Sequence, residues 1–329
     1  MTDHVTVKTV LKRGALVAAA NWQVTAIQFV ADTTFKMLLS VPLIGGILLV
    51  VLVLGREFPD VFSSDIRQGA AFVATALAGE PVALGSFLLA FALVALAGSV
   101  MMFLVKGGTV AVMALGEREA EAVEEPPLRL KSFWTAARFT IERFQDGCRH
   151  FLRRYLRVGL ILIVVYVFSG AAYLAVVFGS YRSTPDSHYG WTAVAGIASA
   201  GLVVWITLVN FLYLLVQMVV VVEDCSVRAA MRQAFRFLRA EPKLAFGVFG
   251  VILLLVVGAT IVSLIATTSL GVIAFVPLAG LAVVPLQLLA WLFRGLVFQY
   301  LGLSALGAYV TLYRRHTAPR AALTTSPGL

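Results

Sequence analysis

The sequence predicts an all-α integral membrane protein that crosses the bilayer six times. Two numbers and one pattern predict this fold: 60% of the residues are hydrophobic, only 13% are charged, and the apolar residues gather in long runs. Soluble domains carry about 25% charged residues, so this composition excludes an ordinary soluble domain. A helix needs about 20 apolar residues to cross the hydrocarbon core, and six runs in this chain reach that length.

The apolar runs are separated by polar segments, which places the predicted spans. They are 35–54, 82–105, 158–179, 191–222, 244–266 and a sixth span that ends at Tyr313. The fourth run is longer than the hydrocarbon core is thick. As one helix it must therefore tilt, protrude from the membrane, or carry Asn210 and Gln217 into a protein interior. The segment Thr267–Pro285 is apolar but contains glycines and prolines, so we expect a re-entrant or outer-surface element there. Small residues in the spans are expected to permit close helix packing: Gly98, Gly170, Ala171, Gly196 and Gly201.

The distribution of positive charge predicts how these spans are oriented. The chain has 26 Lys and Arg residues and a net charge of +9. With the N-terminus inside, 22 of them fall in cytoplasmic segments and 3 in outer connections, and the last one is Arg294. Positive residues concentrate on the cytoplasmic side of membrane proteins, so we expect both termini in the cytoplasm. The same charge suits anionic lipid headgroups as partners better than nucleic acid.

The clearest amphipathic segment precedes the fifth span. Its arginines recur at i, i+4, i+8 and i+11 and therefore share one stripe of a helix: Arg228, Arg232, Arg236 and Arg239. Val227, Met231, Ala234, Phe235 and Leu238 occupy the neighbouring face. This pattern is typical of a helix lying in the membrane interface, and the four arginines are candidate ligands for anionic lipid headgroups. Unspecific anchoring by the same electrostatics is the alternative.

Basic amphipathic helices are expected before spans 1, 3 and 5, which gives the chain a threefold pattern. Each unit runs basic helix, span, outer connection, span, over roughly 5–116, 131–222 and 226–313. We therefore expect a single transmembrane domain over 1–313, with Glu117–Leu128 as a flexible linker inside it. The tail, 314–329, is expected to be a disordered cytoplasmic segment.

One part of the sequence resembles a known group of proteins. The segment from Val221 to Leu255 has an acidic residue after a span, then a short helix with Ala, Arg and an aromatic, then Pro and the next span. In this respect it resembles bacterial six-span proteins, including the membrane domain fused to glycerophosphodiester phosphodiesterases and related stand-alone proteins of unknown function. The segments Lys106–Glu119 and Tyr309–Arg315 resemble the same group. The resemblance implies an all-helical fold in a bacterial inner membrane, and it implies no chemistry.

Polar residues inside the spans are the other candidate functional groups. Arg294 is the only charge well inside an apolar run, and an ionisable group within the membrane is a functional hypothesis by default. It either extends to the outer headgroups or hydrogen-bonds in the interior with Asn210, Gln287 or Gln299. Gln217 is the remaining polar candidate.

No enzymatic constellation is visible in the sequence, so we expect neither a cofactor nor a metal. Four scattered histidines and two isolated cysteines do not supply metal-ligand spacing. Glu124–Arg129 contains the EExxxR string of intramembrane CAAX-type proteases, but it lies in a polar segment and all histidines lie outside the spans, so we interpret it as a chance match.

Two functions remain open on the sequence alone. The first is a non-enzymatic inner-membrane protein that interacts with lipid or scaffolds a membrane-protein partner. The second is a transporter or channel for a small solute or lipid, with the polar residues of the fourth and sixth spans lining a path. The observation that separates them is whether these polar residues converge on a cavity large enough for water.

Overall fold

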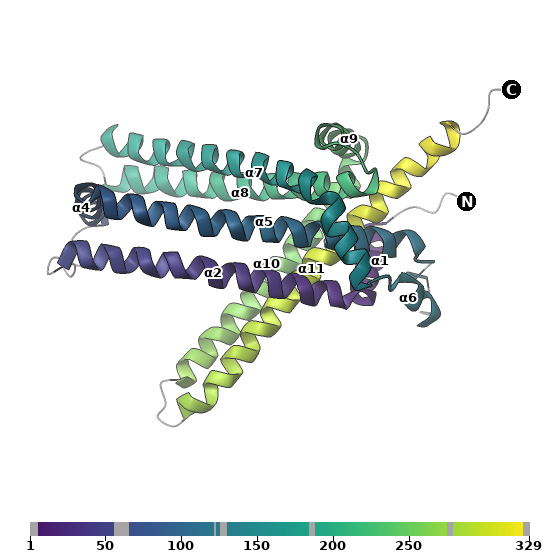
Figure 1. Ribbon diagram of the computed structural model, residues 1–329, viewed down its shortest axis with the longest axis horizontal. Coiled ribbons are helices and arrows are strands. Elements are labelled where there is room, and N and C mark those ends of the chain that lie inside the picture. Colours follow the sequence, from purple (N-terminus) through teal and green to yellow (C-terminus); the bar gives the residue numbers. More distant parts are fainter. Residues whose placement is uncertain are drawn as a thin grey trace. The chain divides into compact units, whose positions relative to one another are not determined.

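The computed structural model describes residues 6–55, 66–121, 123–125, 130–183, 188–274 and 279–324, and every regular element in them is a helix (Figure 1). The helices are α1 Val7–Ala20, α2 Trp22–Leu54, α4 Ile66–Gly79, α5 Pro81–Glu119, α6 Leu130–Ala136, α7 Ile141–Ser183, α8 His188–Val222, α9 Val227–Ala240, α10 Pro242–Ala274 and α11 Ala279–Thr324.

Six of the described helices are long and apolar enough to cross a membrane, which confirms the predicted fold class. They are α2, α5, α7, α8, α10 and α11. Large apolar side chains stay exposed along them, among them Leu52, Val82, Ile197 and Leu254 at 72–80% of their full accessible area. Water would oppose so much exposed apolar surface, whereas lipid chains cover it without cost. The protein is therefore an integral membrane protein.

The chain divides into two compact units. Unit 2 is Val30–Phe103, and unit 1 combines Met1–Phe29 with Leu104–Leu329. Within unit 2, α2 and α5 approach closely where glycines face aromatic rings. A Cβ at Gly46 would lie 2.7 Å from the Phe87 ring, and one at Gly98 would collide with the Phe35 ring. A larger residue at either glycine would therefore push the ring aside.

Unit 1 holds the main core, at the ends of the spans where the short helices gather. α1 packs along α11 and also contacts α10 and α6. α7 pairs with α8, and α10 pairs with α11, as antiparallel neighbours (Figure 1). The largest fully buried side chains come from α5, α7, α8, α9 and α11: Met113, Tyr155, Leu215, Met218, Phe237 and Tyr309.

Two glycine contacts bring helices of unit 1 together. A Cβ at Gly14 of α1 would collide with the backbone of Ser304 and Ala308 on α11, and Gly307 lies against Gly14 from the other side. A Cβ at Gly108 of α5 would lie 2.6 Å from the Sγ of Cys148 on α7. Small residues permit such close backbone approach in membrane helices.

Only one of the four glycines expected to permit close packing does so. Gly98 faces the Phe35 ring, as described above. A Cβ added at any of the other three would meet nothing within 4 Å: Gly170, Gly196 and Gly201. That part of the prediction is wrong, because a small residue in a span does not reveal which side of the helix a neighbour covers.

The structure corrects three expectations about the connections, of which two concern the C-terminal part. In place of a separate re-entrant or outer-surface element, the described residues of Thr267–Pro285 belong to two long helices: α10 continues to Ala274 and α11 begins at Ala279, while 275–278 lie outside the described residues. The segment expected to be disordered from 314 continues α11 as a helix to Thr324, and Arg314 and Arg315 at its start pair with carboxylates of unit 1. Residues 325–329 lie outside the described residues.

The segment Glu117–Leu128 is not the free linker that we expected, as far as its described residues show. α5 runs without a break from Pro81 to Glu119, and the side chains of Glu117 and Glu124 are 7–8% exposed and ion-paired. Two of the glutamates that gave this segment a linker-like composition, Glu117 and Glu124, are therefore structural contacts.

Candidate functional site

The arginine stripe of α9, which is Arg228, Arg232, Arg236 and Arg239, lies on the exposed side of the helix. Within the described part of the chain, none of the four guanidinium groups has a hydrogen bond or an ion pair. Together with Met231 and Phe235 they line one open surface hollow of about 650 Å³. Phe235 is 45% exposed, so the hollow combines four cations with an apolar floor. Anionic headgroups with acyl chains have this same combination of charge and apolar surface.

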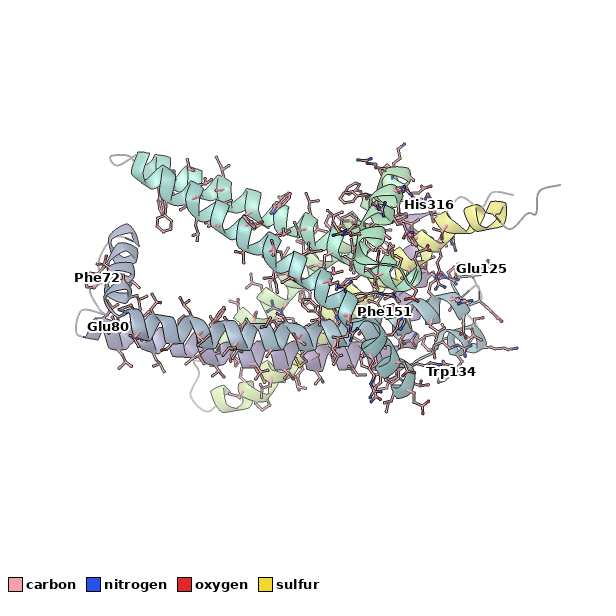
Figure 2. All side chains as sticks on the ribbon, turned by 45° about the horizontal axis from the view of Figure 1, so that its top comes forward. Phe72, Glu80, Glu125, Trp134, Phe151 and His316 are labelled. Atoms are coloured by element: carbon pink, nitrogen blue, oxygen red, sulfur yellow. The ribbon has the colours of Figure 1, made fainter. Side chains whose placement is uncertain are left out.

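The opposite side of α9 packs against the rest of unit 1. Val227, Ala230, Ala234 and Phe237 are buried, and the Phe237 ring packs edge-on against Tyr313 and His316 of α11 at 5.5 and 5.8 Å between ring centres. Val227 and Ala234, which the sequence placed on the apolar face of an interfacial helix, therefore contact protein. Phe235 keeps the exposed place expected of it, and Met231 is half-buried. Figure 2 labels His316 beside α9 at this end of the unit.

The connection between α8 and α9 is held by an exposed carboxylate. Asp224 has a left-handed backbone, with φ 44°, and its Oδ1 accepts from His150 Nε2 at 2.9 Å and from Arg154. The hydrogen bonds from His150 and then Arg154 lower the pKa of Asp224 below its ordinary value of 3.8. Ser226 occupies the N-cap position of α9, but its side chain makes no capping hydrogen bond. Asp224 thus ties the start of α9 to α7.

A cluster of ion pairs, here called the Arg13 cluster, joins α1, the end of α5 and the end of α11. Arg13 is 9% exposed, and its guanidinium donates to Glu117 Oε1 at 3.3 Å and Glu124 Oε2 at 2.7 Å. It also donates to the carbonyls of Glu117, Ala120 and Glu121. These carbonyls lie in the last turn of α5 and directly after it, where helix carbonyls lack intrahelical partners, so Arg13 caps this C-terminus.

The remaining charges of the Arg13 cluster come from α11 and from Lys12. Arg314 Nη1 lies 3.2 Å from Glu117 Oε2, and Arg315 Nη2 lies 3.0 Å from Glu124 Oε1. Lys12 Nζ donates to the Glu124 carbonyl at 2.6 Å. Each carboxylate therefore faces two arginines, which is the pairing that a buried charge requires.

A polar cavity of about 160 Å³ lies deeper in unit 1. Gln217 of α8 and Gln299 of α11, two of the four predicted intramembrane polar residues, both line it. Its other polar lining is Gln28 of α2 with Lys106 and Thr109 of α5. One polar side chain of the fourth span and one of the sixth thus meet at a cavity large enough for several water molecules.

The other two intramembrane candidates lie elsewhere. Asn210 is exposed on α8 and accepts a hydrogen bond from Tyr166 of α7 at 2.6 Å. Arg294 is exposed on α11, and its guanidinium lies 5.7 Å from the centre of the Phe298 ring. Neither lines the polar cavity. Of the two alternatives for Arg294, the exposed position favours extension toward headgroups over an interior hydrogen bond with Asn210, Gln287 or Gln299.

Sequence reasoning missed the Arg13 cluster and the contributions of Gln28, Lys106 and Thr109 to the cavity. One signal for the cluster was present. Arg13 follows Val10 by three residues and precedes Val17 by four, so it falls on the apolar stripe of α1 and not on its polar face. A cation on a buried stripe requires a carboxylate nearby, and the glutamates in 117–124 were the candidate partners. The cavity had no such signal, because its lining comes from four helices.

Comparisons with protein families, with curated proteins and with solved structures find no match to this chain. The resemblance to the membrane domain of glycerophosphodiester phosphodiesterases therefore stays a prediction. Among the described residues, His, Cys, Asp and Glu side chains do not gather in threes as a metal site would need. The arginine stripe, the Arg13 cluster and the polar cavity are thus the candidates from which a function is argued.

Proposed function

We propose that this chain is a non-enzymatic protein of the bacterial inner membrane, with both termini in the cytoplasm, that binds anionic lipid headgroups through the arginine stripe of α9. The observation that carries this proposal is the contrast within α9: its apolar side is docked on unit 1, while its four arginines have no acidic partner among the described residues. A stripe of unpaired cations in a membrane protein attracts anionic lipid from the adjacent leaflet.

The expected strength follows from the number of charges. Each basic residue near an anionic surface contributes about 1 kcal/mol, so four contribute at most about 4 kcal/mol, and salt reduces this value. Phe235 and Met231 beside the stripe add apolar contact with the acyl region. This affinity suits a site that enriches anionic lipid, or that presents it to a membrane-protein partner, more than one that selects a single lipid species.

Native mass spectrometry of the purified protein with a phosphatidylglycerol and phosphatidylcholine mixture tests the proposal. The four-fold variant Arg228→Gln, Arg232→Gln, Arg236→Gln and Arg239→Gln should retain clearly less phosphatidylglycerol than the parent chain. The matched control replaces Arg143, Arg149, Arg153 and Arg157 of α7, which are exposed as well, by Gln. Equal retention by the parent and the α9 variant would refute the proposal. If both variants lost phosphatidylglycerol equally, the stripe would act only by unspecific electrostatic anchoring.

The orientation is tested separately, with a cysteine at position 232 in a background where Cys148 and Cys225 are replaced by Ser. A membrane-impermeant maleimide should label Arg232→Cys only after the inner membrane is opened. Labelling in cells with an intact inner membrane would place α9 outside and exclude a cytoplasmic lipid site.

Transport of a small solute is the second candidate, and one observation favours it: Gln217 and Gln299 meet at the polar cavity. The described residues of the cavity include one cation, Lys106, and no carboxylate. Proton or cation coupling generally uses acidic residues within the spans. The cavity therefore supports binding of a polar or anionic group better than it supports ion-coupled transport.

A further inference from the structure

The polar cavity is built from four helices that are far apart in the sequence. Gln28 lies on α2, Lys106 and Thr109 on α5, Gln217 on α8 and Gln299 on α11. Its apolar wall is formed by Val110, Leu214, Leu303 and Leu306. A small-ligand site usually has a few precisely placed polar groups within an apolar wall.

Three polar atoms of this lining have no partner among the described residues: Gln28 Oε1, Thr109 Oγ1 and Gln217 Nε2. Thr109 and Gln217 are almost fully buried, at 1% and 3% exposure. Buried polar groups in folded proteins are nearly always hydrogen-bonded, so an acceptor, a hydroxyl and an amide donor left together indicate that something else satisfies them. Water molecules and a bound ligand are both able to supply the missing hydrogen bonds, and a binding experiment distinguishes the two occupants.

The charge of the lining selects the class of ligand. Lys106 is the one cationic residue of the lining, and its Nζ lies 5.1 Å from the centre of the Tyr213 ring. The Gln217 amide and the Thr109 hydroxyl are both able to donate to an anionic oxygen. Gln28 Oε1 is only able to accept, so it requires a donor on the ligand. A volume of about 160 Å³ holds roughly five water molecules or one small organic anion.

We propose that this cavity binds a singly charged oxyanion that carries a neighbouring hydroxyl group. Lys106 and the donors on Thr109 and Gln217 face the anionic oxygens, and Gln28 accepts from the hydroxyl. Two sources offer this chemistry: a free short 2-hydroxycarboxylate, and the headgroup of phosphatidylglycerol, whose phosphodiester is followed by hydroxyls. The site is independent of the arginine stripe, because no residue lines both.

The test uses the whole chain 1–329 with the four stripe arginines changed to Gln, so that lipid bound at α9 does not contribute. Lactate and phosphatidylglycerol are the two probes, and acetate and phosphatidylcholine are their references. Ligand-induced thermal stabilisation and native mass spectrometry are the readouts. Stabilisation by lactate alone assigns the site to a free solute, and stabilisation by phosphatidylglycerol alone assigns it to a headgroup.

Substitutions in the cavity show whether the probe binds there. Gln217→Leu and Lys106→Met should each weaken binding at least tenfold. Asn210→Leu is the matched control, because Asn210 lies two turns before Gln217 on the same helix, outside the cavity, and it should bind like the parent.

Gln217→Leu also reports on folding. Without ligand it should be at least as stable as the parent, because an apolar side chain of similar size replaces a buried amide whose Nε2 has no partner among the described residues. If it fails to fold, Thr109→Val takes its place. The proposal is overturned if neither probe stabilises the parent, which leaves water as the only occupant, or if the cavity variants bind as tightly as the parent.

Discussion

The two short basic helices α1 and α9 have the same length, 14 residues, and each precedes a long apolar helix. Their arginines nevertheless have opposite surroundings. In α1, Arg13 is buried between Glu117 and Glu124, and Lys12 donates to a backbone carbonyl. In α9, all four arginines are exposed and unpaired within the described part of the chain. A basic amphipathic pattern therefore does not by itself identify an interfacial helix. What decides is whether carboxylates from elsewhere in the fold reach its cations.

The difference also separates stability from binding. A buried ion pair is strongly destabilising to break, because the remaining charge has lost its water as well as its partner. An exposed, unpaired arginine contributes little to folding and remains available for a ligand. Substitutions on α1 should therefore act on assembly, and substitutions on the stripe of α9 should act on lipid retention.

The largest effect is expected for Arg13→Ala. It leaves Glu117 and Glu124 with one arginine each and removes a donor to the carbonyls at the end of α5, so the free energy of unfolding should fall by about 3–5 kcal/mol. Thermal unfolding in detergent measures this loss. Lys8→Ala, an exposed residue of the same helix, is the control and should change little. A stable Arg13→Ala protein would show that the Arg13 cluster is incidental.

Phe237→Ala should come next, at about 3 kcal/mol, because the ring is 1% exposed and its removal leaves a cavity against Tyr313 and His316. Phe235→Ala, at the exposed side of α9, should cost well under about 1 kcal/mol. The pair is compared by thermal unfolding. Similar losses for both rings would contradict the division of α9 into a docked side and a free side.

Gly14→Ala should destabilise by about 1–3 kcal/mol, since the new methyl group collides with the backbone of Ser304 and Ala308. At Gly258 of α10, where a Cβ has open space, the same change should be neutral or should stabilise by up to about 1 kcal/mol, as Ala favours the helix. Denaturation of the two variants side by side gives the sign of each effect. A neutral Gly14→Ala would mean that α1 and α11 are free to move apart.

The smallest effect concerns Asp224 and depends on pH. Its folded pKa lies below the ordinary value of 3.8, so its contribution is fully present above that pH and is lost as the pH falls through the folded pKa. The carboxylate is 60% exposed, so Asp224→Asn should cost less than about 1 kcal/mol at neutral pH.

Unfolding curves at pH 7 and pH 3 check the pH dependence. The difference between parent and Asp224→Asn should shrink at the lower pH. Asp146→Asn, at an exposed position of α7 that has no ion pair among the described residues, should show no such change. A pH-independent difference for Asp224→Asn would mean that its ion pair with Arg154 does not form in solution.

The periodicity of single helices was readable from the sequence, and contacts between helices were not. The four arginines of α9 share a stripe because 100° per residue places them there, and the structure keeps them together on the exposed side. The same reasoning misplaced Val227 and Ala234, because a helix pattern does not say whether an apolar side meets lipid or protein. It also treated Glu117 and Glu124 as linker residues, because their partner Arg13 lies more than 100 residues away.

By itself, the sequence determined that this protein is helical, that it has six membrane-spanning segments, and which residues share a side of each helix. These properties follow from local periodicity and from the free energy of burying apolar residues in lipid. Only the tertiary structure decided which cations are neutralised and which stay free, and that Gln28, Lys106, Thr109, Gln217 and Gln299 surround one cavity. Electrostatic pairing and cavity formation depend on distances between atoms that are remote in the chain. The residue pattern of a single helix does not determine those distances.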